Sequence, residues 1–543
     1  MQTLTFPIAD LAASLGLEPE EVSPFGGFAA KVELSAIDRL AGKPDGKLVS
    51  VTGMTPTRGG EGKTTTAISL VQGLGHSGER PLLAIREPSL GPVFGIKGGG
   101  TGGGRAQLVP MERINLHFTG DIHAIGAANN LLAAMIESHI VHGNELGLDP
   151  GSITWRRCVD MDDRALRQVV IGLGGSANGF ERGTGFDITA ASEVMAIVAV
   201  SRDLDDLRAR LGSITVGATG DGEPVTAEQI RAAGSMTVLL KDALKPNLVQ
   251  TGEGNPALVH CGPFANIAHG NNSLVADLLG LKLADYVVTE NGFGAEMGFE
   301  KFVDIVCRLG GIAPSTVVLV ATVQALKHHG GDPDGGVPAM ERGVENLRAN
   351  LRIVREVGLD CVIAVNRFPG DSAAEIGAAV RLAGELGAAG VGVNDGFERG
   401  GKGAVELAEA VVEATSAPTT PGHLYSLDEP IEDKIAAIAT RAYGAAGVEL
   451  SPLAREQAER FERAGLGSLP ICMAKTHLSL SHDPALIGAP TGFTLPVREL
   501  RPYTGAGWIV AVCGDMQTMP GLPADAAALR IDVDQAGNTV GLR

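Results

Sequence analysis

Thr55-Pro-Thr-Arg-Gly-Gly-Glu-Gly-Lys-Thr-Thr-Thr66 separates two apolar runs of different periodicity. The run before it, Leu48–Thr52, alternates and is rich in β-branched residues, so it predicts a strand. The run after it, Ala67–Leu74, carries apolar residues at helical spacing and predicts a helix. A strand, a glycine-rich turn and a helix in this order form a cradle for phosphate, because backbone N–H groups and the helix N-terminus both face the turn.

The Lys-Thr pair that ends the turn is typical of a nucleoside triphosphate site. Lys63 is placed to reach the outer phosphates, and the hydroxyl of Thr64 is placed to bind Mg²⁺. The stretch departs from G-x-x-x-x-G-K-[ST] at one position, since Thr57 stands where the first Gly belongs. An ordinary glycine-rich turn is the alternative. The residues predicted to bind the nucleotide are Thr57, Arg58, Gly59, Gly60, Glu61, Gly62, Lys63 and Thr64.

Further strand-like runs end in polar or glycine-rich turns and are followed by helical patterns. These runs are Leu82–Ile85, Asp285–Val288, Val317–Thr322, Cys361–Val365 and Ala389–Val393. The alternation predicts an α/β fold with a mainly parallel sheet flanked by helices, of the P-loop NTPase kind. Ligands of such sheets bind outside the carboxyl ends of the strands, so the turns after these runs are the places to search for a site.

A chain of 543 residues should form more than one domain. The segment after residue 150 has charge-rich helices and short β-like pieces, which predict an inserted domain. Beyond about Ser416 the Pro and Gly content rises while apolar runs persist, which predicts an ordered C-terminal α/β domain. The predicted division is a nucleotide-binding region at 1–150, an inserted domain at 151–280, a return to the first sheet at 281–360 and a C-terminal domain at 361–543.

The composition narrows the classes of partner. The formal charge of −19 argues against binding to nucleic acid or a membrane surface, so an anionic ligand needs local basic groups. The six Cys are far apart and form no C-x-x-C pair, which is typical of reduced thiols in the cytoplasm. Met1–Pro7 lacks the basic and apolar regions of a secretion signal, and the apolar run near Val317–Leu326 is interrupted by Thr and Gln and is too short to span a bilayer.

Basic residues gather after the second predicted strand. Arg86 follows it directly, and Lys97 and Arg105 flank a run with six Gly in seven residues. At the mouth of the sheet, the guanidinium of Arg86 can hold two oxygens of a phosphate or carboxylate. The alternative is that Arg86 pairs with a structural carboxylate such as Glu87 and the glycine run is a flexible loop.

Asp121 lies in the stretch His117-Phe-Thr-Gly-Asp-Ile-His123. It is a candidate base, orienting group or Mg²⁺ ligand near a reaction centre, and a structural Asp in a turn is the alternative. The two flanking His are too loosely grouped to favour a dedicated zinc site.

Two Phe residues follow consecutive predicted strands. Phe368 and Phe397 are separated by a single helical crossover, Ser372–Leu386, and the strands of such a unit are usually neighbours. Two rings on adjacent loops can sandwich a flat ligand. The alternative is that each ring packs under its own loop.

Longer motifs give the chain a resemblance, almost from end to end, to the formate–tetrahydrofolate ligase family. The motifs are Thr55–Thr57, Gly60–Thr65, Arg86–Gly99, Val109–Glu112, Ile114–Asp121, His123–Leu132, Phe264–Gly270, Cys472–Thr476 and Met519–Pro523. The resemblance implies ATP-dependent ligation of formate to tetrahydrofolate, giving 10-formyltetrahydrofolate, ADP and phosphate through formyl phosphate, in one-carbon folate metabolism.

The resemblance also assigns roles to residues. It implies that Lys63 and Arg86 stabilise the moving phosphoryl group, with Asp121 as a third catalytic candidate. Mg²⁺ is implied together with the nucleotide, and Thr64 is its candidate ligand. Activation by a monovalent cation, K⁺ or NH₄⁺, and a homotetramer come from the resemblance alone.

In this family two aromatic side chains enclose the folate ring, and the C-terminal domain contributes them. The matching residues are Phe368, in Asn366-Arg-Phe-Pro369, and Phe397, shortly before Gly400–Gly403. The second position is typically Trp, so Phe397 offers less stacking area and no indole N–H, and we expect weaker folate binding. Arg58-Gly59 also departs from the family pattern, where Pro and a small or apolar residue are usual; the change adds flexibility and a charge.

Two other functions are compatible with the cradle. The chain could activate a different small carboxylate through the same anhydride chemistry, which predicts that another acid is used better than formate. It could instead be a nucleotide-driven switch, which predicts ATP turnover without formate or folate. The switch gives no role to Arg86 or to the two Phe residues.

Overall fold

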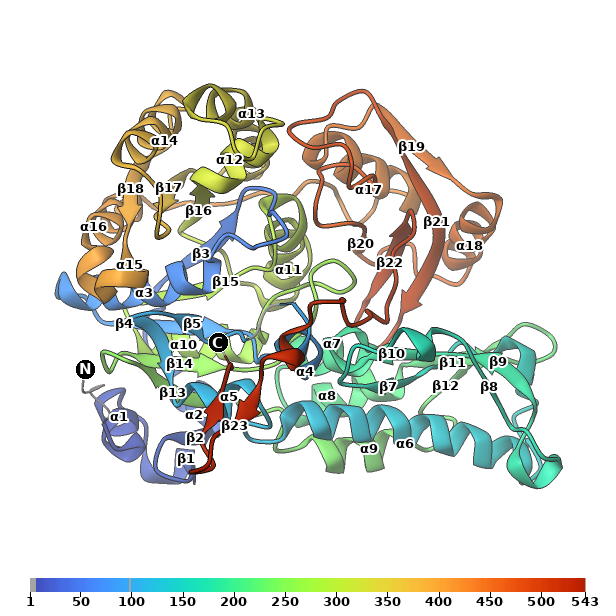
Figure 1. The fold of residues 1–543 in the computed structure, drawn as a ribbon. Coiled ribbons are helices and arrows are strands. Elements are labelled where there is room, and N and C mark those ends of the chain that lie inside the picture. Colours follow the sequence, from blue (N-terminus) through green and yellow to red (C-terminus); the bar gives the residue numbers. More distant parts are fainter. Residues whose placement is uncertain (1–5, 97–98, 543) are drawn as a thin grey trace.

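The computed structural model describes residues 6–96 and 99–542, and within them the central element is a twelve-stranded sheet (Figure 1). Strand β3 (Lys47–Gly53) lies between β15 (Tyr286–Glu290) and β16 (Thr316–Thr322) and is parallel to both. Next to β15 lies β4 (Pro81–Ile85), and next to β16 lies β17 (Cys361–Asn366), also in parallel. The strand before the glycine-rich turn is therefore in the middle of the sheet.

The remaining strands extend the sheet on both sides. They are β18 (Gly390–Asn394) beside β17 and, beyond β4, β14 (Pro256–Val259), β13 (Asn247–Thr251), β2 (Ala29–Val32) and β1 (Val22–Phe25), with β6 (Ala106–Val109) and β5 (Gly102–Gly103) attached to β13. The pairs from β14 to β18 are parallel, whereas β13, β2 and β1 form antiparallel pairs. The sheet is mixed, with a parallel centre.

The parallel strands are buried on both faces, as their apolar composition predicts. Side chains alternate between the faces: Val49 and Val51 of β3 pack in a cluster with helix α3 (Lys63–His76), while Leu48 packs in a cluster with α10 (Leu274–Leu283). This alternation places helices on both sides of β3 and fixes the register of the turn that follows it.

Between β6 and β13 the chain leaves the sheet and forms an elongated unit, seen at the bottom right of Figure 1. Its long helix α6 (Asp121–Val141) lies beside α9 (Ala233–Leu240). The other elements of the unit are β7 (Arg157–Val159), β8 (Val169–Ile171), β9 (Arg182–Thr184), β10 (Phe186–Ile188), α7 (Glu193–Val200), α8 (Leu204–Gly212), β11 (Thr215–Ala218) and β12 (Pro224–Thr226). The strand pairs described in this region are short, and an apolar cluster between its helices supports it.

After residue 430 a second sheet follows, whose described strands lie in the order β19 (Gly447–Leu450), β21 (Thr494–Tyr503), β22 (Trp508–Cys513) and β20 (Ile471–Ala474). Helices α17 (Ile431–Ala437) and α18 (Pro452–Arg463) pack on it. One apolar cluster joins this sheet to the central one through α13 (Val337–Glu356). The other α-helices of the described residues are α1 (Ile8–Ser14), α2 (Ser35–Arg39), α4 (Leu90–Phe94), α5 (Met111–Asn115), α11 (Arg308–Gly310), α12 (Val323–His329), α14 (Ala373–Glu385), α15 (Gly396–Arg399) and α16 (Val405–Ala414).

The predicted α/β fold is confirmed, and each of the six predicted strands named above is a strand of the central sheet. The predicted boundaries at residues 280 and 360 fall inside the part of the chain that supplies this sheet, because β13 and β14 precede the first and β17 and β18 follow the second. Across residues 6–96 and 99–542, no helix combines the length and the apolar character needed to cross a bilayer.

Candidate active site

The turn between β3 and α3 is a glycine-rich loop, Thr57–Gly62, at the carboxyl edge of the central sheet. Gly60 and Gly62 have φ angles of +76° and +68°, a region that Gly adopts without strain. A Cβ atom on Gly62 would also lie 2.5 Å from Nδ2 of Asn366. The same Asn366 amide donates a hydrogen bond of 3.0 Å to the carbonyl oxygen of Glu61. The sharp entry into α3 therefore requires Gly62.

The side chain of Glu61 holds the glycine-rich loop in place through hydrogen bonds. Its side chain is buried, and its Oε1 accepts a hydrogen bond of 2.7 Å from the backbone N–H of Thr57. Its other oxygen accepts from the hydroxyl of Thr322 at the end of β16. Arg58, Gly59 and Gly60 remain exposed at the tip. The eight residues predicted to bind the nucleotide thus form one loop and the first turn of α3, but the Glu61 carboxylate points away from the tip.

Three predicted site residues converge on one carboxylate, that of Glu290. The Thr64 hydroxyl donates to Glu290 Oε2 at 2.6 Å, and a guanidinium nitrogen of Arg86 lies 3.5 Å from Glu290 Oε1. Burial lowers the pKa of Lys63, and the nearby carboxylates of Glu290 and Glu61 oppose that shift. The convergence follows from the topology, because β4, β15 and β3 are adjacent and parallel and end at the same edge.

Arg86 and Lys63 are both held against backbone. Arg86 donates a hydrogen bond of 3.2 Å to the carbonyl oxygen of Pro263. The stem of Lys63 lies over the end of β3, where a Cβ on Gly53 would stand 3.3 Å from its Cδ. Two cationic groups therefore flank the carboxylate at the base of the glycine-rich loop.

Asp121 lies in a separate, buried cluster. Both of its oxygens are 2.6 Å from Nζ of Lys31, and Oδ2 also accepts a hydrogen bond of 2.8 Å from Asn247. Among the described residues, these partners and not Lys63, Arg86 or Thr64 bond to it. The nearby Glu87 is buried, with one oxygen that accepts no hydrogen bond in the described part of the chain. Burial, together with the charge of Asp121, raises the pKa of Glu87 well above its ordinary value.

Phe368 and Phe397 follow neighbouring strands, as predicted, because β17 and β18 pair in parallel. The ring of Phe368 lies next to the glycine-rich loop, with its Cζ 3.4 Å from where a Cβ on Gly62 would be. The ring of Phe397 lies over Gly103 and Gly104. The backbone carbonyl oxygen of Phe397 accepts a hydrogen bond from Arg105 N–H. Phe397 is 43% exposed, so its ring is accessible to a ligand. Each ring contacts a loop other than the one that carries it, which differs from the alternative that each ring packs under its own loop.

Two features of the site could not be predicted from the sequence, or only in part. Glu290 lies in the turn predicted to follow the strand Asp285–Val288, so its position at the sheet edge could be predicted, but its contacts with Thr64 and Arg86 could not. Lys31, which pairs with Asp121, lies 90 residues away in β2, a strand that is not predicted from the sequence. Lys97, predicted to flank the glycine run beside Arg86, lies outside the described residues.

The chain is similar in sequence to known proteins. A model of the family described as formate–tetrahydrofolate ligase matches residues 1–543. The formate–tetrahydrofolate ligase of Roseiflexus sp. (strain RS-1) is 55% identical over 549 aligned residues, which cover 99% of this chain and 97% of the relative. Proteins of the same name from Saccharopolyspora erythraea and Cutibacterium acnes are 53% and 51% identical, with the same coverage. The chain therefore belongs to the formate–tetrahydrofolate ligase family.

Proposed function

We propose that this protein ligates formate to tetrahydrofolate with ATP, giving 10-formyltetrahydrofolate, ADP and phosphate. Family membership supports the proposal, and one structural observation carries it. Thr64 and Arg86 both contact Glu290 directly beneath the glycine-rich loop, with Lys63 close by. Cationic groups thus gather where the triphosphate of a bound nucleotide would end.

The first step is phosphoryl transfer to formate. A formate oxygen attacks the γ-phosphorus, the bond from that phosphorus to the bridging oxygen breaks, and ADP leaves with the electron pair. Because both reactants are anions, catalysis depends on positioning and charge neutralisation. Lys63 and Arg86 are the groups that supply it. The 3.5 Å separation of Arg86 and Glu290 is long for a hydrogen bond, so the guanidinium is available to hold phosphoryl or formate oxygens.

The residues present fit Mg²⁺. The Thr64 hydroxyl and the Glu290 carboxylate lie 2.6 Å apart, and oxygen atoms of these kinds are the ligands that this ion prefers. When bound with the nucleotide, Mg²⁺ would neutralise charge on the β- and γ-phosphate oxygens. We assign Thr64 as its proposed ligand and Glu290 as the carboxylate that either binds it or orients Thr64.

The second step transfers the formyl group. The N10 amine of tetrahydrofolate attacks the formyl carbon, the carbon–oxygen bond to phosphate breaks, and the amine loses its proton. Phe368 and Phe397 are the proposed folate contacts, since their loops are adjacent at the carboxyl edge of the sheet. Asp121 is retained as a proposed site residue, and its bonds to Lys31 and Asn247 suit orientation of neighbouring groups better than proton transfer.

Four further properties of the protein are proposed from the sequence alone. Activation by K⁺ or NH₄⁺ and assembly into a homotetramer are proposed from the resemblance, while a cytoplasmic location is proposed from the composition and the isolated Cys residues. The division at 150, 280 and 360 is likewise a proposal. A kinetic comparison in potassium and sodium buffers tests the first, and analytical ultracentrifugation tests the second.

The decisive experiment measures ADP and 10-formyltetrahydrofolate with each substrate omitted in turn. We expect ADP to form at an appreciable rate only when formate and tetrahydrofolate are both present. Faster turnover with acetate would favour the other carboxylate-activating function. ATP turnover independent of both substrates would favour the nucleotide switch, and either result would overturn the proposal.

A further inference from the structure

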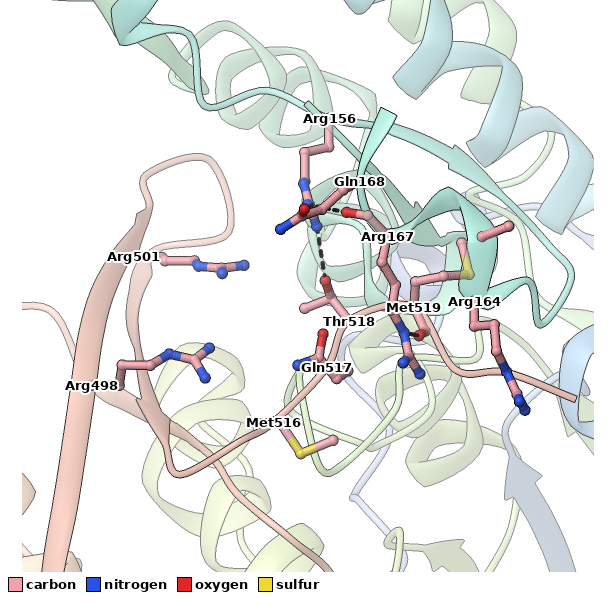
Figure 2. Close-up of a pocket in the computed structure, with 11 residues that line it drawn as sticks. Arg156, Arg164, Arg167, Gln168, Arg498, Arg501, Met516, Gln517, Thr518 and Met519 are labelled. Atoms are coloured by element: carbon pink, nitrogen blue, oxygen red, sulfur yellow. Dashed lines mark hydrogen bonds between the residues drawn. The ribbon is translucent and has the colours of Figure 1, made fainter. Parts of the chain in front are cut away.

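Outside the candidate active site, five arginines gather around one cavity, which we call the arginine pocket: Arg156, Arg164, Arg167, Arg498 and Arg501. Figure 2 shows Arg498 and Arg501 reaching in from one wall, and Arg156 and Arg167 from the opposite one. The first pair comes from β21, and the others come from the elongated unit between β6 and β13. The pocket therefore lies between two parts of the molecule that are more than 300 residues apart in sequence.

The charge of the arginine pocket is not balanced by the protein. Asp187 lies 2.8 Å from Arg156, and Glu499 lies 2.8 Å from Arg501 and 3.2 Å from Arg498. Arg164 and Arg167 instead donate to the carbonyl oxygens of Leu522 and Met519.

Among the described residues, no carboxylate is within ion-pair distance of Arg164 or Arg167, and no Asp or Glu lines the cavity. Arginine does not lose its proton at any ordinary pH. Two carboxylates thus serve five fixed positive charges, in a chain whose net charge is −19. Placing these charges together is unfavourable unless an anion binds between them.

The shape of the arginine pocket selects the kind of anion. Its volume of about 460 Å³ is within the range of small-molecule sites. The side-chain amides of Gln168 and Gln517 add neutral hydrogen-bonding groups, whereas the Thr518 hydroxyl already donates to Asp187. Because the guanidinium groups stand on opposite walls, a ligand must carry anionic groups at more than one end to reach both.

We propose that the arginine pocket is a binding site for a compact polyanion, a small molecule with two or more phosphate or carboxylate groups. Guanidinium groups bind both kinds of oxygen in a two-pronged manner, so the shared chemistry is the multiple charge. A formate or acetate ion carries one negative charge and cannot balance the positive charge that Asp187 and Glu499 leave uncompensated. The site is distinct from the glycine-rich loop and does not depend on the proposed ligase function.

The stretch of chain between two of the lining arginines is in contact with the segment that follows Arg86. Asp160, which lies between Arg156 and Arg164 in the chain, accepts hydrogen bonds of 2.5 Å from the Ser89 hydroxyl and 2.9 Å from Leu90 N–H. A polyanion that orders the elongated unit would therefore also stabilise the start of α4. The expected consequence is a measurable rise in the thermal midpoint of the whole chain on binding.

Isothermal titration calorimetry on the full-length protein tests the proposal, with pyrophosphate and citrate as separate probes and acetate as the singly charged control. We expect at least one polyanion to bind with one site per chain in the arginine pocket, and acetate to bind at least tenfold more weakly. Tighter binding of pyrophosphate would indicate recognition of phosphate, and tighter binding of citrate would indicate recognition of carboxylate. Since pyrophosphate can also enter the glycine-rich loop, each titration is repeated on Lys63→Ala, which should retain the pocket's binding.

Two variants locate the site. Arg167→Gln and Arg501→Gln should each weaken binding at least tenfold, whereas Arg348→Gln, an exposed residue paired with Glu345 on α13, should not. Circular dichroism melts establish whether each variant is folded. If Arg167→Gln or Arg501→Gln does not fold, Arg164→Gln takes its place. Absence of one-to-one polyanion binding, or binding that falls with Lys63→Ala but not with the arginine variants, would overturn the proposal.

Discussion

The glycine-rich loop and the arginine pocket both gather positive charge, but by different means. Around the loop, Lys63 and Thr64 are consecutive, and buried carboxylates of the same site partly balance the cations. In the pocket, the cations come from residues 156 to 501, and their partners are backbone carbonyls and the two carboxylates of Asp187 and Glu499. A local motif thus builds the first site, and tertiary packing alone builds the second.

This difference teaches where function can be found in a sequence. A contiguous loop sets its own geometry through Gly conformation and the helix N-terminus, so its chemistry is visible in a dozen residues. A site assembled from distant walls has no such pattern, and only the charge balance of the folded chain exposes it. The following variants test whether the two sites respond as this distinction requires.

The largest effect is expected for Lys63→Ala. Loss of a positive charge aimed at the transferring phosphoryl group should lower kcat about 100- to 1,000-fold, while the thermal midpoint changes little. Steady-state kinetics and thermal melts of the same preparation measure both. Arg348→Ala is the control and should match the parent protein; turnover of Lys63→Ala near that of the parent would remove Lys63 from the mechanism.

The next largest effect is expected for Gly62→Ala. The new methyl group meets Nδ2 of Asn366 at 2.5 Å, and the residue keeps a φ of +68°, so the loop must distort. We expect a stability loss of about 1–3 kcal/mol and at least tenfold weaker ATP binding. Gly59→Ala is the matched comparison, because its nearest neighbour would be 3.8 Å away. Equal destabilisation by both changes would contradict this account of the loop.

A pH effect is expected near the arginine pocket, at Glu193 of α7. Its buried carboxylate accepts hydrogen bonds from Gly505 and Ala506 N–H, which join the elongated unit to the second sheet. Burial raises the pKa of Glu193 to about 8, and the two N–H groups oppose the shift. The folded state then binds a proton that the unfolded state releases near its ordinary pKa of 4.5, so stability falls as pH rises from about 4.5 to 8.

Glu193→Gln tests this effect, because the amide oxygen can accept the same bonds without ionising. The variant should lose less stability than the parent between pH 5.5 and 8, by on the order of 1 kcal/mol for each pH unit. Chemical denaturation at the two pH values measures the difference. Parallel pH profiles for the two proteins would show that Glu193 does not ionise on unfolding.

The smallest effect is expected for Phe397→Trp. The indole adds stacking area beside Gly103 and restores an N–H donor, so the KM for tetrahydrofolate should fall severalfold with kcat nearly unchanged. Phe397→Leu is the companion variant and should raise this KM. An unchanged or higher KM in Phe397→Trp would mean that the ring at 397 does not contact folate.

Much of the fold could be predicted from the sequence, because it rests on local patterns. The run Leu48–Thr52 gave β3, the run Ala67–Leu74 gave α3, and the crossover after Cys361–Val365 placed β17 beside β18. The loop residues from Thr57 to Thr64 were visible for the same reason. Their assigned roles stay predictions until ligands are measured.

The partners of the site residues could not be predicted, because they depend on strand order. Glu290 reaches Thr64 and Arg86 only because β15 inserts between β3 and β4, two strands that follow each other in the chain. The bond between Lys31 and Asp121 needs β2 to lie beside β13. The arginine pocket needs β21 to face the elongated unit, and no spacing rule relates residues so far apart.

The position of β15 also bears on how the chain is made. Strand β3 has no sheet partner until residue 286 has been synthesised, more than 200 residues after β3 itself. At roughly 5–20 residues per second, a ribosome needs on the order of ten seconds or more for that interval. During this time both edges of β3 lack their partners, and β4 can pair only with β14, which is a condition under which nascent chains associate with one another. The nascent protein should therefore depend on chaperones until β15 emerges from the ribosome.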